Sequence, residues 1–278
     1  MSFHLIHFTK NLNGYVDVNL YLPVGTEYED MVEPGEKFQT LWILHGGAGN
    51  FMEWPQYSAI EKLAMLNKFA VVSVDGDNSG YNDMPNGDNY YTYITQELPA
   101  FLRKHFQLSD KREDNFICGL SMGGHGSAKI GFANPDKYGA IGIFSGGPTD
   151  PVAAFEASTP EEKERQLTYF LKADSLQPGG PNDIWGNFLR LGENGDPKPL
   201  IFVACGTKDM PFVYGGMKDF EKFVKENGRE DDVIFEEWEG VHCWDFWDVA
   251  VHKFVDLLPL KDKGIWRKWY NERHPEAR

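Results

Sequence analysis

The sequence of 278 residues is poor in cysteine, in basic residues and in long hydrophobic runs. Its three cysteines are widely spaced and odd in number, which excludes a disulfide framework and favours a reducing, cytoplasmic location. Lysine and arginine total 27 against 42 acidic residues, and the net charge of −15 argues against nucleic-acid and membrane partners. No apolar run approaches the roughly 18 residues of a membrane-spanning helix. The N-terminus lacks the pattern of a signal peptide, so we expect none.

The hydrophobic segments that are present follow the pattern of an α/β protein. Residues 3–8 and 15–22 flank a turn at 11–14 and read as antiparallel strands. From there on, continuous apolar runs alternate with helical segments, which predicts a mostly parallel sheet with helices on both faces. The predicted strands of this sheet are 41–44, 69–74, 115–120, 140–144, 200–204 and 232–238, and the predicted helices are 59–67, 90–106, 123–133, 217–227 and 244–258.

Three segments depart from this alternation. Pro99 must kink the helical pattern of 90–106 or mark a new start. Residues 24–37 read as a polar loop. Residues 146–199 exceed an ordinary connection and contain a charged helix near 160–172. We expect a single domain over 1–278, in which 146–199 is an insertion that forms a lid or pocket wall, or a surface excursion without a role.

The pentapeptide Gly119-Leu120-Ser121-Met122-Gly123 matches the pattern G-x-S-x-G of a nucleophile elbow. It follows a predicted buried strand and opens a predicted helix, which is the setting that this motif requires. Such a turn is strained and leaves no room for side chains beside the serine, which explains the flanking glycines. The motif therefore predicts that Ser121 is a nucleophile, although a glycine-rich turn with an idle serine would look the same.

A serine nucleophile needs a histidine base that is oriented by a carboxylate, in the chain order serine, acid, histidine for this motif. His242 lies between the last predicted strand and the final predicted helix, where the base is expected. Asp209 follows the strand 200–204 and precedes His242 by one strand–helix unit, so it is the expected acid. The competing carboxylates are Asp150, Asp245 and Asp248.

Backbone amides and aromatic side chains complete the predicted site. The amide of Met122, directly after the serine, and that of Gly47, in a glycine-rich turn after a strand, are the expected oxyanion hole. Aromatic residues near the expected site loops favour acyl or phenolic groups, with core packing as the alternative. The predicted substrate contacts are Trp54, Tyr81, Tyr91 and Trp244. No histidine, cysteine and carboxylate set has metal spacing, so we expect neither a metal nor a cofactor.

Four segments together resemble the esterase D-like α/β-hydrolases, and most closely the bacterial tributyrin esterases. The segments are Leu44-His45-Gly46-Gly47, Gly119-Leu120-Ser121-Met122-Gly123-Gly124, Cys205-Gly206-Thr207-Lys208-Asp209 and Gly240-Val241-His242-Cys243-Trp244. The resemblance covers most of the chain and implies the α/β-hydrolase fold. It also implies a triad of Ser121, Asp209 and His242, with the Met122 and Gly47 amides as oxyanion hole. Many relatives have an acidic residue in place of Cys243 and a larger apolar residue in place of Gly47.

The resemblance implies a serine carboxylesterase that hydrolyses small-molecule, short-chain acyl esters through an acyl-enzyme, without cofactor. The alternatives are a thioesterase similar to S-formylglutathione hydrolases, a feruloyl or acetyl-sugar esterase, and an acyltransferase. A non-catalytic binding protein on the same fold is the alternative from another class. The sequence leaves a homo-oligomer open.

Overall fold

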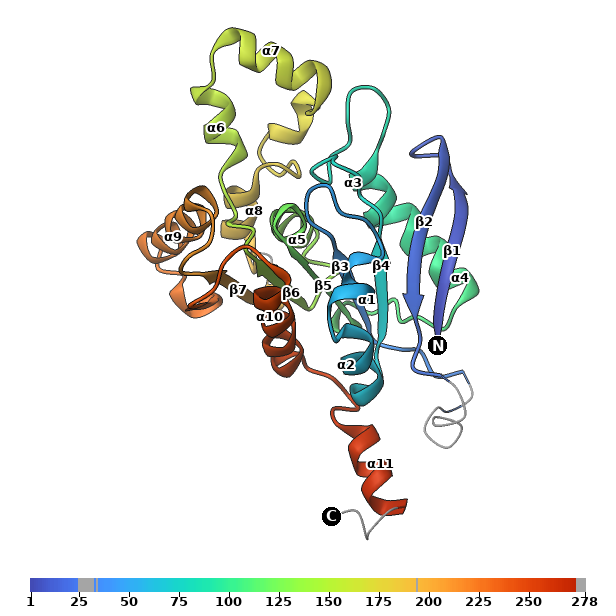
Figure 1. Cartoon of the computed structure of the whole chain (residues 1–278). Coiled ribbons are helices and arrows are strands. Elements are labelled where there is room, and N and C mark those ends of the chain that lie inside the picture. The colour runs from blue at the N-terminus through green and yellow to red at the C-terminus, as the bar shows by residue number, and fades with distance from the viewer. Residues whose placement is uncertain (25–32, 34, 194, 274–278) are drawn as a thin grey trace.

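A mixed eight-stranded sheet forms the centre of the structure (Figure 1). In the order of pairing, its strands are β1 (Ser2–Thr9), β2 (Gly14–Tyr21), β4 (Ala70–Val74), β3 (Thr40–Leu44), β5 (Asn115–Leu120), β6 (Ala140–Phe144), β7 (Leu200–Gly206) and β8 (Ile234–Trp238). The pairings β1–β2 and β2–β4 are antiparallel, and the pairings from β4 to β8 are parallel. The structure is a computed structural model that describes residues 1–24, 33, 35–193 and 195–273. The predicted mostly parallel sheet with antiparallel N-terminal strands is confirmed.

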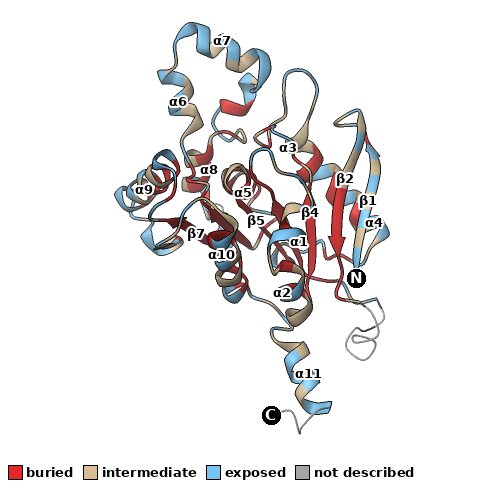
Figure 2. Ribbon diagram, in the orientation of Figure 1, coloured by how far each residue is buried: buried red, intermediate tan, exposed pale blue. Residues whose placement is uncertain are grey.

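Helices cover both faces of this sheet. One face carries α1 (Glu53–Tyr57), α2 (Ile60–Asn67) and α10 (Trp244–Leu257), and the other carries α4 (Leu98–His105), α5 (Met122–Ala133), α8 (Ile184–Arg190) and α9 (Pro211–Glu226). Because side chains alternate along a strand, Leu41 and Ile43 of β3 pack toward the first group and Trp42 and Leu44 toward the second. Every residue of the central strands β3, β4, β5 and β6 is buried, as Figure 2 shows, which explains their mostly apolar sequences.

Proline lies near the start of two helical segments. The helical pattern of 90–106 forms α3 (Tyr90–Thr92), a π-helical segment η2 (Tyr93–Glu97) and then α4, with Pro99 in the first turn of α4. The helical backbone does not break at Pro99, because Glu97 and Leu98 have αR dihedrals and the Leu98 amide donates to the Tyr93 carbonyl, so Pro99 follows a π-helical turn within one continuous helix. Helix α9 begins at Pro211 and not at 217, because a first-turn residue needs no amide donor and proline is tolerated there. The short 3₁₀ turns are η3 (Arg112–Asp114), η4 (Ala173–Leu176) and η5 (Glu230–Asp232).

The chain between β6 and β7 makes a helical excursion from the sheet (Figure 1). Its first helices, α6 (Pro151–Ala157) and α7 (Pro160–Tyr169), are capped by the side chains of Asp150 and Thr159 and contain no buried residue. The charged helix predicted near 160–172 is confirmed in α7, whereas α6 and α8 were not predicted. Whether the excursion acts as a lid stays a prediction.

The remaining segments are a predicted loop after the N-terminal strands and a helix at the C-terminal end of the described chain. The polar loop predicted at 24–37 falls mostly outside the described residues. The last described helix, α11 (Ile265–Arg273), extends away from the sheet and was not predicted (Figure 1). Within the described ranges, none of the helices has the length and apolarity to cross a membrane.

Candidate active site

Ser121 lies at a strained turn between β5 and α5. Its backbone has φ 53° and ψ −118°, a region that residues with a side chain rarely adopt. The flanking glycines are required by close packing. A Cβ on Gly123 would lie 2.4 Å from the Leu44 carbonyl oxygen, and a Cβ on Gly119 would lie 2.4 Å from the Gly123 carbonyl oxygen. The turn thus holds the Ser121 side chain at the carboxyl end of the sheet, as the motif predicts.

Ser121, His242 and Asp209 form a continuous hydrogen-bonded chain. The distance between His242 Nε2 and Ser121 Oγ is 2.9 Å, and that between His242 Nδ1 and Asp209 Oδ1 is 2.8 Å. His242 lies in the loop between β8 and α10, and Asp209 lies between β7 and α9. With Nδ1–H donating to the carboxylate, Nε2 is free to accept the serine proton, which is the arrangement that activates a serine nucleophile.

The carboxylate of Asp209 is buried and held by several donors. Burial raises its pKa, but hydrogen bonds outweigh burial, with that from His242 first, and the pKa ends below its ordinary value. The Met210 amide donates to Oδ1 at 2.7 Å, and the Cys205 thiol lies 3.7 Å from Oδ2. Burial first, and the Asp209 charge second, raise the pKa of Cys205 to about 12, so the thiol keeps its proton. Asp209 therefore stays ionised and faces His242 in a fixed orientation.

The two predicted oxyanion donors border the same turn. Met122 is the first residue of α5, so its amide has no acceptor within the helix and lies at the positive end of the helix dipole. The loop after β3 passes against the nucleophile, because a Cβ on Gly46 would lie 3.5 Å from Ser121 Cβ. The adjacent amide of Gly47 belongs to this loop. The structure therefore brings the Met122 amide and the loop that contains Gly47 beside the nucleophile, while the role of both amides stays a prediction.

A cavity of about 310 Å³ opens beside Ser121. Its lining includes Met122, His125, Ser145, Gly147, Phe212 and Val213. Burial first, and the charge of Lys129 second, lower the pKa of His125 to about 3, so this imidazole is neutral at physiological pH. Phe212 is 72% exposed and places an apolar ring at the edge of the cavity. The cavity thus combines apolar walls with few polar groups, as small-molecule sites do.

The structure corrects three of the four predicted substrate contacts. Trp54 and Tyr81 are 0% exposed, so neither has surface to offer a substrate. The indole of Trp54 donates to the Leu44 carbonyl at 2.9 Å, within the core. Tyr91 lines a separate cavity with Asp83. An aromatic residue near a loop has the same sequence signature whether it lines a pocket or lies beneath it.

Trp244 is the fourth of these residues and lies close to the triad. Its ring packs edge-on against Trp247, with 5.4 Å between centroids, and Trp247 packs edge-on against His242 at 4.9 Å. Trp244 thus supports the histidine through one intervening ring, and its contact with substrate stays a prediction.

His125 and Phe212 line the cavity but were not predicted from the sequence. The signal for His125 is its spacing, because it follows Ser121 by one helical turn and so shares its helix face. Phe212 follows Asp209 in the first turn of α9, where a side chain at the carboxyl end of the sheet faces the same opening. Among the residues that the structure describes, no group of three or more His, Cys, Asp or Glu side chains could hold a metal ion.

Comparison with known proteins agrees with this geometry. A family model described as "Putative esterase" matches residues 9–253. An acetyl esterase of Caldicellulosiruptor saccharolyticus is 34% identical over 249 residues, covering 87% of this chain and 91% of the relative. The structure resembles that of the fluorophosphonate-binding serine hydrolase F of Staphylococcus aureus, with TM-score 0.77, 25% identity and coverage of 93% of this chain and 98% of that one. An S-formylglutathione hydrolase of Staphylococcus aureus has the same fold, with TM-score 0.74, 24% identity and coverage of 93% and 98%.

Proposed function

Because the chain belongs to the putative esterase family and has the fold of the α/β-hydrolases, we propose that it is a carboxylesterase acting on short-chain acyl esters. That it is a serine hydrolase follows from the family, from the acetyl esterase relative and from the serine hydrolase of similar structure. The observation that carries the proposal is the hydrogen-bonded chain from Ser121 Oγ through His242 to Asp209.

In the proposed mechanism, Ser121 Oγ attacks the ester carbonyl while His242 Nε2 takes the hydroxyl proton. Asp209 stabilises the imidazolium that forms and keeps its ring in place. The carbonyl oxygen becomes an oxyanion, which the amides of Met122 and Gly47 stabilise. His242 then protonates the departing alcohol, leaving an acyl group on Ser121. Water, deprotonated by His242, attacks this acyl-enzyme, and His242 returns the proton to Ser121 Oγ as the acid is released.

The cavity supports a small substrate. A volume of about 310 Å³ lies at the lower end of the roughly 300–1,000 Å³ of small-molecule sites. His125 is neutral and Phe212 is apolar, so neither of these two lining residues can form an ion pair with a charged acyl group. The acetyl esterase relative agrees with an acyl group of this size. We therefore propose uncharged acetyl and similarly short acyl esters as substrates.

Replacement of the nucleophile tests the proposal. Ser121→Ala is expected to lower kcat on p-nitrophenyl acetate by a factor of about 10⁴ or more, because the attacking hydroxyl is lost. Ser73→Ala is the matched control, since Ser73 lies in β4, is 0% exposed and has a hydroxyl without a hydrogen-bond partner. Full activity in Ser121→Ala would refute the proposal, provided that both variants give the circular dichroism spectrum of the wild type.

The substrate and the non-catalytic alternative need separate measurements. A fluorophosphonate probe should label the wild type at Ser121, and an absence of label would favour a binding protein. A panel of p-nitrophenyl esters from acetate to octanoate should give the highest kcat/KM at the short end. A higher kcat/KM for S-formylglutathione than for any ester would replace the carboxylesterase by a thioesterase.

A further inference from the structure

Tyr81 is buried beneath the site and contacts the loop that carries one of the oxyanion donors. Its hydroxyl donates to the carbonyl oxygen of His45 at 2.9 Å. We propose that Tyr81 is a positioning residue, which holds the oxyanion loop, residues 45–49, so that the Gly47 amide faces the substrate carbonyl. This inference rests on the proposed function and assigns Tyr81 a part in it that needs no contact with substrate.

The oxyanion loop is fixed from within by His45. This residue is 0% exposed, and its Nδ1 lies 2.6 Å from the Gly46 carbonyl oxygen while its Nε2 accepts from the Gly76 amide at 2.9 Å. Nδ1 therefore carries the proton and donates to Gly46. In a trans peptide the carbonyl and the following amide point in opposite directions. Holding the Gly46 carbonyl toward the imidazole thus directs the Gly47 N–H away from it.

The segment 76–82 supplies the outer contacts of the oxyanion loop. Asn78 Oδ1 accepts from the Ala48 amide at 2.7 Å, and the Gly76 amide and the Tyr81 hydroxyl both bind His45. Asp77, Gly80 and Tyr81 all have positive φ, at 46°, 59° and 56°. Two of these three residues are not glycine, so the segment adopts a conformation that its own sequence disfavours. Tertiary contacts must hold it there.

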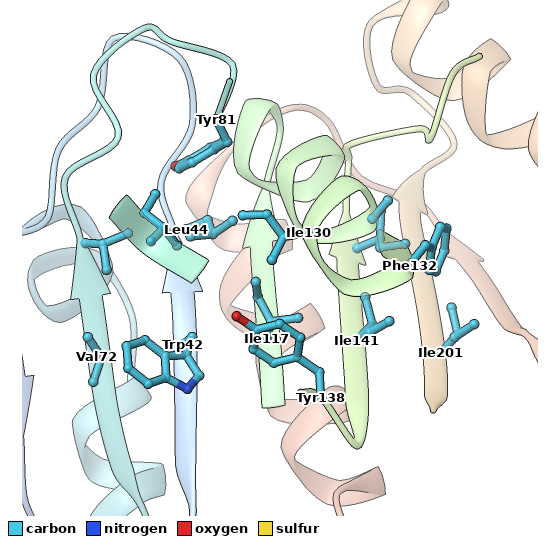
Figure 3. Close-up of a cluster of buried hydrophobic side chains, with 14 of the residues drawn as sticks. Trp42, Leu44, Val72, Tyr81, Ile117, Ile130, Phe132, Tyr138, Ile141 and Ile201 are labelled. Atoms are coloured by element: carbon cyan, nitrogen blue, oxygen red, sulfur yellow. The ribbon is translucent and has the colours of Figure 1, made fainter. Parts of the chain in front are cut away.

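Those contacts come from α5, the helix that begins beside the nucleophile. A Cβ on Gly126 would lie 2.4 Å from Tyr81 Cδ2, so the Tyr81 ring packs directly on the helix, as Figure 3 shows. Lys129 Nζ donates to the Gly80 carbonyl at 2.7 Å and to Asn82 Oδ1 at 2.6 Å. Helix α5 thus fixes Tyr81, and Tyr81 fixes the oxyanion loop. Helix α5 therefore helps to position the Ser121 hydroxyl, the Met122 amide and the Gly47 amide.

The variant Tyr81→Phe tests this role, because it keeps the ring and removes only the hydroxyl. We expect kcat on p-nitrophenyl acetate to fall about tenfold with KM close to the wild-type value. This is less than the 10²–10³ of a deleted oxyanion donor, because the Gly47 amide is displaced and not lost. The inhibition constant of a trifluoromethyl ketone, which forms an oxyanion on the serine, should rise by the same factor. The pH profile should be unchanged, since His242 and Asp209 are not touched.

The matched control is Tyr93→Phe, which removes another buried tyrosine hydroxyl, one bound to His7 Nε2 at 2.9 Å. It should keep wild-type kcat and inhibition constant. Wild-type kcat in folded Tyr81→Phe would overturn the inference, and so would a lower kcat with an unchanged inhibition constant. If Tyr81→Phe does not fold, Asn78→Ala removes the exposed contact to Ala48 and should raise the inhibition constant instead. Lack of esterase activity in the wild type would refute the proposed function and is therefore distinct from these outcomes.

Discussion

At the scale of single residues, Lys129 is a lysine whose side-chain amine is buried in the protein interior. It is 2% exposed, and burial lowers its pKa from 10.5 to about 7. Its two hydrogen-bond acceptors, the Gly80 carbonyl and the Asn82 amide oxygen, are neutral. Among the residues that the structure describes, no carboxylate is paired with the charge that Lys129 acquires below neutral pH. Lys129 donates hydrogen bonds to segment 76–82, and the neutral amine can donate them as well as the charged one.

The pKa of Lys129 predicts how stability depends on pH. Between about pH 7 and 10.5 the unfolded chain binds the lysine proton and the folded chain does not, so the free energy of unfolding rises with pH. The contribution is about 1.4 kcal/mol per pH unit in this window. Urea unfolding at pH 7.5, 8.5 and 9.5 should show this slope in the wild type relative to Lys129→Met. Parallel stability curves for the two proteins would contradict the prediction.

The residues of the triad could be named from sequence because each has a restricted place in the chain. The elbow motif fixes Ser121, and the order of strands leaves one loop each for Asp209 and His242, which the structure brings into hydrogen-bond contact. The aromatic residues could not be assigned in this way. Trp54 and Tyr81 follow strands and precede helices, but only packing places them under the site.

At the scale of elements, the contact between α5 and β3 is set by glycine. A Cβ on Gly123 would lie 2.4 and 2.5 Å from the carbonyl oxygens of Leu44 and His45. Both contacts are to backbone, so a side chain at 123 must push the helix off the strand that leads into the oxyanion loop. Stability and activity are therefore coupled at this position.

The variant Gly123→Ala should lose both stability and activity. We expect a loss of roughly 3 kcal/mol or more in the free energy of unfolding, at the upper end of overpacking effects, together with a large fall in kcat. Gly215→Ala is the matched control, because Gly215 lies in α9 and a Cβ there meets no atom within 4 Å. It should gain roughly 0.5–1 kcal/mol from the higher helix propensity of alanine. Thermal unfolding and steady-state kinetics of both variants check the pair, and similar stabilities would count against this account.

Elements were predictable where burial is complete. The central strands β3, β4, β5 and β6 are buried throughout, so their sequences are mostly apolar, with Thr40, Ser73 and Asn115 as buried polar exceptions. Helix α6 has no buried residue and therefore no apolar periodicity to detect, although Asp150 caps it. Helix α8 is only seven residues long, too short for periodicity to separate it from a loop.

At the scale of the whole molecule, the charge of −15 acts on any charged substrate. The field of a protein with a net negative charge repels anions over about 30 Å at 0.01 M salt but only about 10 Å at 0.1 M. We expect kcat/KM for p-nitrophenyl hemisuccinate, which bears a carboxylate, to rise roughly two- to tenfold between these salt concentrations. The value for neutral p-nitrophenyl butyrate should stay constant. An equal response of the two esters would contradict the prediction.

The exposure of helices α6 and α7 affects how this protein can diverge in evolution. Neither helix contributes a buried residue to the core, so substitutions there cost little folding free energy. The elbow at Ser121, by contrast, tolerates little change at its glycines, because a Cβ on Gly119 or Gly123 would lie 2.4 Å from a backbone carbonyl oxygen. Selection can therefore alter α6 and α7 many times without first acquiring stabilising mutations elsewhere. Over evolutionary time, these two helices are freer to change than the turn that carries the nucleophile.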